Sequence, residues 1–259
     1  MNRINCIIAT LAMVYAGACS SAFAGTVTFY GFDQASGIGG PTPNTDTAHA
    51  AFIAALNPAT KGVETFENLK VGSFNGGALS VSFPTTSITG TITSNVTDYA
   101  EVAKMNDPVS GIYTNYGTNF LKVATQGGMT FFDLKLSQAV TAIGFFASDV
   151  SDFGRSGFLS EQIVLDGGTP INIVNVSPAN IQSGSASYFG LITSTPFSDI
   201  KIINPNPTNN SFLGADGLGI DNIVVGQAQA VPEPSSFALL GLGAIGLVFG
   251  AYQRRQTAV

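Results

Sequence analysis

Between Gly25 and Gly226 the sequence is a succession of short runs rich in β-branched and aromatic residues, each ended by Gly, Asn, Asp or Pro. Alternation of apolar and polar residues with a period of two is typical of strands, and these turn residues end them. Many short strands with Gly-rich turns predict an all-β fold, a jelly-roll-like β-sandwich of two sheets. We expect its strands at 25–32, 63–69, 79–83, 87–93, 120–124, 129–136, 139–147, 163–165, 171–176, 188–193, 200–204 and 219–225.

Two turns in this pattern predict hairpins. Gln126-Gly127-Gly128 lies between the runs 120–124 and 129–136, and Asp166-Gly167-Gly168 lies between 163–165 and 171–176. Short Gly-rich connections of this kind usually join antiparallel neighbours.

One short helix is expected, at residues 46–56. Thr45 or Asp46 can cap its start, and Asn57-Pro58 ends it. The chain's only histidine, His49, lies on this helix, which excludes a multi-histidine metal site. We expect His49 to be an exposed helix residue.

Residues 1–24 predict a secretory signal peptide. A basic residue near the start precedes an apolar stretch, and Ala22-Phe23-Ala24 is a small-residue cleavage site that would leave Ala24 and Gly25 on either side of the cut. The alternative is a lipoprotein signal with Cys19 as the lipidated residue. Both cysteines of the chain, Cys6 and Cys19, lie in this segment, so the mature protein is expected to have no disulfide.

The C-terminal segment has three parts. Val231-Pro232-Glu233-Pro234 is followed by an apolar run without charge at about 235–252, and then by Arg254-Arg255. A run of about 18 apolar residues is near the lower limit for a transmembrane helix. The two arginines place the C-terminus in the cytoplasm by the positive-inside rule. A buried core helix is the alternative, but the flanking prolines and arginines argue against it.

This order of parts resembles the PEP-CTERM sorting signal of Gram-negative bacteria, which is also labelled the ice-binding protein C-terminal motif. The resemblance implies recognition by the membrane enzyme exosortase, with cleavage near the Pro-Glu-Pro. It also implies an inner-membrane precursor, export to the outer surface or extracellular matrix, and an association with extracellular polysaccharide. The predicted organisation is a signal peptide at 1–24, a β-sandwich ectodomain at 25–228 and a sorting signal at 229–259.

The charge of the central part excludes one class of partner. Of 10 basic residues, Arg3 and Arg254-Arg255 lie in the terminal segments, as does Glu233 among 16 acidic residues, which leaves a net charge of −8 for the remainder. Such a charge argues against nucleic acid and anionic membrane surfaces as partners. It is compatible with cations or neutral glycans.

A second resemblance concerns calcium. Thr65-Phe66-Glu67 and Ile220-Asp221-Asn222-Ile223 are similar to the first and last strands of jelly-roll carbohydrate-binding modules. The resemblance implies that Glu67 and Asp221 share a structural calcium ion, for which carboxylate oxygens are suitable ligands. The alternative is that Glu67 ends a strand in solvent and Asp221 accepts hydrogen bonds in a turn. The acidic stretch 149–152 lacks the Gly and Glu of an EF-hand loop and is expected to be a polar loop.

Glycan binding would need exposed aromatic side chains. Tyr113 and Tyr116, in a Gly- and Asn-rich stretch, are the candidates, although tyrosines packed over the core are the alternative.

The sequence contains no G-x-S-x-G, H-E-x-x-H or P-loop motif, and we expect no enzymatic activity. The leading hypothesis is therefore a non-catalytic structural or adhesive surface protein. A calcium-stabilised carbohydrate-binding module is the second hypothesis, and a secreted glycoside hydrolase is the third.

Overall fold

The computed structural model describes residues 25–34, 39–74, 76–94, 100–104, 112–114, 116–125, 130–152, 159–206 and 216–229. The predicted signal peptide and sorting signal lie outside this part of the chain. The described residues belong to one compact unit, Gly25–Gln229.

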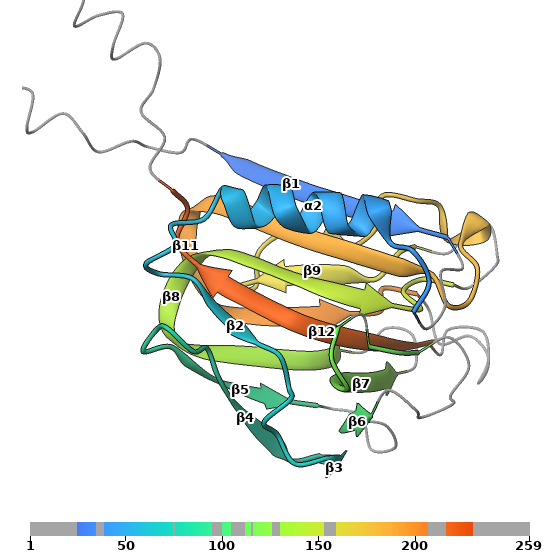
Figure 1. Cartoon of the computed structure of the whole chain (residues 1–259), viewed down its shortest axis with the longest axis horizontal. Helices are drawn as coiled ribbons and strands as arrows, with labels where there is room; N and C mark the ends of the chain where they lie inside the picture. Colours follow the sequence, from blue (N-terminus) through green and yellow to red (C-terminus); the bar gives the residue numbers. More distant parts are fainter. Residues whose placement is uncertain are drawn as a thin grey trace, which may run out of the picture. The chain divides into compact units, whose positions relative to one another are not determined.

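Within these residues twelve strands form a single antiparallel sheet, and one α-helix lies beside it (Figure 1). The prediction of an all-β protein with one short helix is confirmed. The prediction of two separate sheets is not, because hydrogen bonds connect all the strands into one sheet. The elements are β1 (Thr26–Asp33), α2 (Pro43–Ala54), β2 (Gly62–Glu64), β3 (Gly72–Ser73), β4 (Ala78–Ser82), β5 (Thr89–Thr93), β6 (Ala100–Lys104), β7 (Asn119–Thr125), β8 (Thr130–Ser148), β9 (Gln162–Leu165), β10 (Ile171–Asn172), a 3-10 turn (Pro178–Asn180), β11 (Ala186–Ile203) and β12 (Asp216–Gly226).

Two long strands, β8 and β11, pair with each other over most of their length. Their register shifts between Ile192 and Phe197, which marks an irregularity near the middle of both strands. On one side of this point β8 pairs with β12 and β11 with β1; on the other side β8 pairs with β5 and β11 with β9. The sequence predicts four separate strands here, because polar residues at the irregularity look like turns. A bulge instead lets each strand continue while it bends.

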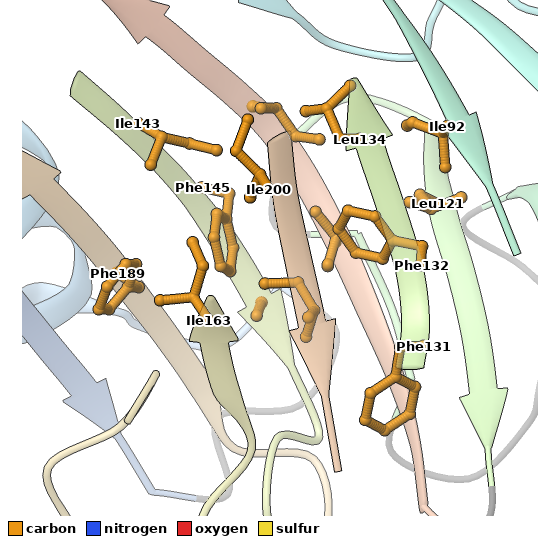
Figure 2. Close-up of a cluster of buried hydrophobic side chains, with 14 of the residues drawn as sticks. Ile92, Leu121, Phe131, Phe132, Leu134, Ile143, Phe145, Ile163, Phe189 and Ile200 are labelled. Atoms are coloured by element: carbon orange, nitrogen blue, oxygen red, sulfur yellow. The ribbon is translucent and has the colours of Figure 1, made fainter. Parts of the chain in front are cut away.

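The bent sheet encloses one large apolar core. Alternate residues of the two halves of β8 and β11 point into it, including Phe145 and Phe189 from one half and Leu134 and Ile200 from the other. Figure 2 shows these side chains gathered between the strands, together with Ile92 of β5 and Ile163 of β9. Burial of so many aromatic and branched side chains supplies the main stabilisation of the fold.

One of the two predicted hairpins is confirmed. β9 pairs with β10 through Ile163 and Ile171, and in the turn between them both Asp166 and Gly167 have positive φ. The other prediction is wrong, because β7 pairs with β6 and β12 and does not pair with β8 within the described residues. A short Gly-rich connection therefore does not join sheet neighbours here.

The helix is where the sequence predicts it, but it begins three residues earlier, at Pro43. Neither Thr45 nor Asp46 is its cap. The carboxylate of Asp33, at the end of β1, accepts hydrogen bonds from the backbone N–H groups of Asn44 (3.2 Å) and Thr45 (2.8 Å). Free N–H groups at a helix start favour such a negative partner. Because the cap comes from 11 and 12 residues away, local sequence does not reveal it.

Phe52 joins α2 to the outer face of the sheet. Its ring lies over Gly144 of β8 and Gly190 of β11, which face each other across the two strands. A Cβ atom built on Gly190 would lie 2.7 Å from the Phe52 ring, closer than real Cβ atoms approach. The two glycines thus form a depression that a fully buried Phe52 fills, with Phe29 and Tyr188 packed around it.

This packing gives a test by double-mutant cycle. We expect Gly190→Ala to lower the free energy of unfolding by about 1–3 kcal/mol, the usual cost of overpacking. In a Phe52→Ala background, which itself costs about 3–5 kcal/mol, the same Gly190→Ala change should cost little, because the ring it strikes is gone. Urea unfolding of residues 25–229 measures both effects. Equal costs in the two backgrounds would show that Phe52 is not what requires the glycine.

Candidate functional site

The predicted calcium and glycan residues lie around residues 112–114 and 116–118. This segment contacts β8 at Ser148 and Phe146 and β12 at Asp221. Asp221 of β12 lies opposite Phe146 of β8, at a register shift between these strands. Its Oδ2 accepts hydrogen bonds from Thr114 Oγ1 (2.6 Å) and the Tyr116 N–H (2.9 Å). Its Oδ1 accepts one from the Asn222 N–H (2.7 Å). The carboxylate is buried and holds the chain above it in place.

Burial raises the pKa of Asp221 to about 6, against the hydrogen bonds from Thr114, Tyr116 and Asn222, which lower it. The negative charge of Glu67 raises the pKa further. The electrostatic influence of Glu67 means that the two predicted calcium ligands lie in the same region of the molecule.

Glu67 lies on a turn, not at the end of a strand. β2 ends at Glu64, five residues earlier than predicted, because Phe66 has a φ of 60° and leaves the extended conformation. Glu67 Oε1 accepts hydrogen bonds from the N–H groups of Thr118 (2.6 Å) and Asn119 (2.9 Å), and Oε2 accepts one from Thr118 Oγ1 (2.7 Å). Burial alone would raise the pKa of Glu67, but these hydrogen bonds outweigh it and lower the pKa.

Gly117 makes the approach of Glu67 possible. It has a φ of 71°, and a Cβ atom there would collide with the Glu67 carboxylate. Glycine is therefore required at this position for both its backbone conformation and its lack of a side chain.

Both predicted calcium ligands thus bind the same stretch of chain, residues 114–119. Calcium needs six to eight oxygen ligands, whereas the groups bonded to these two carboxylates are N–H and O–H donors. Within the described ranges no group of three or more His, Cys, Asp or Glu residues could hold a metal ion. The arrangement as described does not provide a full ligand set, and calcium binding at Glu67 and Asp221 stays a prediction.

Tyr113 does not lie where glycan binding requires it. The prediction of an exposed side chain is wrong, because Tyr113 is only 3% exposed. Its hydroxyl donates a hydrogen bond to the Gly184 carbonyl (3.2 Å), and its N–H donates to Ser148 Oγ (3.0 Å). This tyrosine packs over the core, as in the alternative considered from the sequence.

Tyr116, by contrast, is 41% exposed. Its ring packs against Phe146, with centroids 4.7 Å apart and the two planes tilted by 60°, and its hydroxyl donates a hydrogen bond to Asp46 of α2. Partial burial and the neighbouring Asp46 carboxylate both raise the pKa of Tyr116. The site therefore offers one exposed aromatic ring, held between α2 and the sheet.

His49 is half-buried, and the prediction of an exposed helix residue is wrong. Its ring lies 4.7 Å from Phe146 and 5.1 Å from Tyr188, between centroids. Burial lowers the pKa of His49, and Lys61 adds to this effect while Asp46 opposes it. The neutral ring is therefore favoured, as part of an aromatic cluster.

The acidic stretch 149–152 is a tight, buried turn. Asp149 and Ser151 both have a φ of 63°, which is unusual for residues with a side chain. Asp149 Oδ1 accepts a hydrogen bond from the Gly184 N–H (2.9 Å). Burial raises the pKa of Asp149 to about 7 against this bond, and the nearby Asp152 raises it further.

A buried carboxylate beside this turn is missed by sequence reasoning. Glu161 is fully buried, its N–H donates to Ser151 Oγ (3.0 Å), and Ser151 Oγ also contacts its carboxylate. Glu161 only precedes a short predicted strand, and no local pattern marks it as buried.

The raised pKa of Asp149 predicts a pH dependence of stability. The folded protein keeps a proton on Asp149 between about pH 4, the usual pKa of an unfolded Asp, and about pH 7. The stability due to this proton is fully present below the unfolded pKa and is lost as the pH rises to about 7. We expect Asp149→Asn to reduce this fall in the free energy of unfolding, as measured by urea titrations at several pH values. Asp166→Asn, on an exposed turn, is the control, and parallel profiles for wild type and Asp149→Asn would contradict the assignment.

The C-terminal segment matches a protein-family model. Residues 230–255 match the family model of the PEP-CTERM protein-sorting motif. No curated protein matches the chain. Among the described residues no helix has the length and apolar character needed to cross a membrane, and the predicted span at 235–252 lies outside them. The motif supports secretion through sorting by exosortase. The chain is thus a protein with a C-terminal PEP-CTERM sorting motif, immediately after the folded unit Gly25–Gln229.

Proposed function

We propose that this protein is an exported surface or matrix protein whose β-rich unit has a non-catalytic structural or adhesive role. The observation that carries the proposal is the sorting motif at 230–255, which begins directly after the last residue of the folded unit. In this proposal residues 1–24 direct export and are removed between Ala24 and Gly25. The apolar run at about 235–252 then holds the precursor in the inner membrane until exosortase releases it near Pro232-Glu233-Pro234.

The folded unit has features suited to such a role. Its core is enclosed by one continuous antiparallel sheet, and buried carboxylates such as Asp221 hold its loops. Its cysteines lie outside the predicted mature chain, so its stability in an oxidising compartment depends on packing and hydrogen bonds. A strand-rich domain with a large apolar core is suited to a passive role outside the cell.

Replacing Arg254 and Arg255 by Ala tests the sorting proposal. The basic pair holds the C-terminus on the cytoplasmic side, so we expect the variant to accumulate as a full-length precursor, while the wild type is found truncated near residues 232–234 in the outer fractions. Cell fractionation with C-terminal mass analysis measures both. Gln253→Ala and Gln256→Ala serve as neutral controls from the same segment. Wild-type protein that stays full-length in the inner membrane would overturn the proposal.

A second candidate function is a calcium-stabilised, carbohydrate-binding module of the jelly-roll type, favoured by the exposed ring of Tyr116. An aromatic face with nearby polar groups is what a sugar ring packs against. Under this candidate, Tyr116→Ala should lose retention on a column of extracellular polysaccharide, while Tyr113→Phe, at a buried position, should keep it. The melting temperature should also rise with calcium and fall with chelator. Unchanged retention and melting would eliminate this candidate. The glycoside hydrolase hypothesis stays a prediction without a nominated pair of carboxylates.

A further inference from the structure

The residues just before the sorting motif, 227–229, are held to the folded unit by hydrogen bonds. The Gln227 carbonyl accepts a hydrogen bond from the Asn57 N–H (3.0 Å), and the Ala228 N–H donates to Thr141 Oγ1 (2.9 Å). The Gln229 N–H donates to the Ala55 carbonyl (2.8 Å). The chain is therefore fixed to the body of the domain up to residue 229.

These residues lie at one end of the domain, which we call the exit end. We define it by the loops 55–61 and 83–88 and by the irregular segments 137–139 of β8 and 193–198 of β11. Hydrogen bonds join the first three of these segments and Gln227. Thr85 Oγ1 donates to the Lys61 carbonyl (2.6 Å), Gln138 Nε2 donates to Ser87 Oγ (2.9 Å), and Gln227 Nε2 donates to the Ala139 carbonyl (3.2 Å).

The chain also enters the domain at the exit end. The Ser194 N–H donates to the Gly25 carbonyl (3.1 Å), and β1 begins beside Thr193. In Figure 1 the start of β1 and the tip of β12 lie on the same side, near the bends of β8 and β11. β1 has 8 residues, so its far end at Asp33 is about 25 Å away at the usual rise per residue.

The exit end and the opposite end differ in charge. Lys61 is the one charged residue in the four segments of the exit end, whose exposed residues are Ser, Thr, Pro, Ala and Gln. Asp166 lies beside this end, with Oδ1 accepting hydrogen bonds from the N–H groups of Ser198 and Asp199, and the Asp199 carboxylate has the Lys135 ammonium 3.7 Å away. At the opposite end Asp46 is exposed in the first turn of α2, next to the end of β1, and Asp152 is half-buried after the end of β8. The segments of the exit end therefore carry a lysine and no carboxylate, whereas the opposite end presents carboxylates to solvent.

We propose that the exit end faces the lipid headgroups in the membrane-bound precursor, with the acidic end directed away from the bilayer. This inference rests on the proposed function, because it needs the apolar run to be inserted. Only residues 230–234 separate Gln229 from that run. Five residues span at most about 18 Å even when fully extended, which is shorter than the length of β1.

Electrostatics favours the same orientation. Anionic headgroups repel carboxylates and attract lysine over a distance of about a Debye length, so the end with Lys61 and few carboxylates fits against them. In this proposal the exosortase acts on a segment that begins one residue after the last one fixed to the exit end.

Two serine-to-cysteine variants test this orientation in the full chain. Ser194 is exposed at the exit end, and Ser177 is exposed beside the 3-10 turn at the other end, where the Asn180 carbonyl accepts a hydrogen bond from Gln34. Each cysteine is introduced with Cys6→Ser and Cys19→Ser and labelled with a small fluorophore. The protein is reconstituted into phosphatidylethanolamine–phosphatidylglycerol vesicles that contain a headgroup-linked nitroxide quencher. We expect strong quenching at Ser194→Cys and little at Ser177→Cys.

Flotation of the vesicles is measured first. Protein that does not float with them overturns the proposed membrane-bound precursor, and the orientation falls with it. Protein that floats but is quenched equally at the two sites, or more at Ser177→Cys, overturns the orientation alone. Thr195→Cys and Asn180→Cys are a second pair, used if a first variant lacks the wild-type urea transition.

Discussion

The pairing of β8 with β11 is the constraint on which the rest of the structure depends. These two strands share most of their length, and each changes its outer neighbour where their register shifts. Because both strands bend there, their inward side chains face one another, and residues such as Phe145 and Leu134 enter the same core from two halves of one strand. The other strands attach to this pair, directly or through one neighbour or more.

The outer face of the same pair carries the helix and the candidate site. The helix depends on two glycines and the site on one buried carboxylate. Gly144 and Gly190 leave the depression that Phe52 fills. Asp221 provides a buried acceptor that holds Thr114 and Tyr116 above the sheet. The hydroxyl of Tyr116 then joins this loop to Asp46 on the helix. Helix, loop and sheet are therefore linked by a few polar contacts around an aromatic cluster.

Sequence patterns predicted the helix and most of the strands, because alternation and turn residues are local properties, but they missed β3 (Gly72–Ser73) and β6 (Ala100–Lys104). They failed where residues far apart in the chain determine the helix cap or the strand pairing. Asp33 caps a helix that begins 10 residues later, and β7 pairs with β12 rather than with the strand that follows it. For the site, the resemblance to carbohydrate-binding modules named Glu67 and Asp221, and both carboxylates bind the segment 114–119, while calcium binding there stays a prediction. It did not show that Tyr113 is buried and Tyr116 exposed, because neighbours from other strands determine exposure.

The sequence by itself determined the sorting motif, because this motif is linear and consists of consecutive residues: Pro232-Glu233-Pro234, an apolar run and two arginines. It also determined the all-β class through its period of two. Only the tertiary structure decided that the strands form one bent sheet, that Phe52 packs over a pair of glycines, and that residues 227–229 are hydrogen-bonded to the body of the domain. These features arise from contacts between residues far apart in the chain, and no local pattern encodes which partner each residue meets.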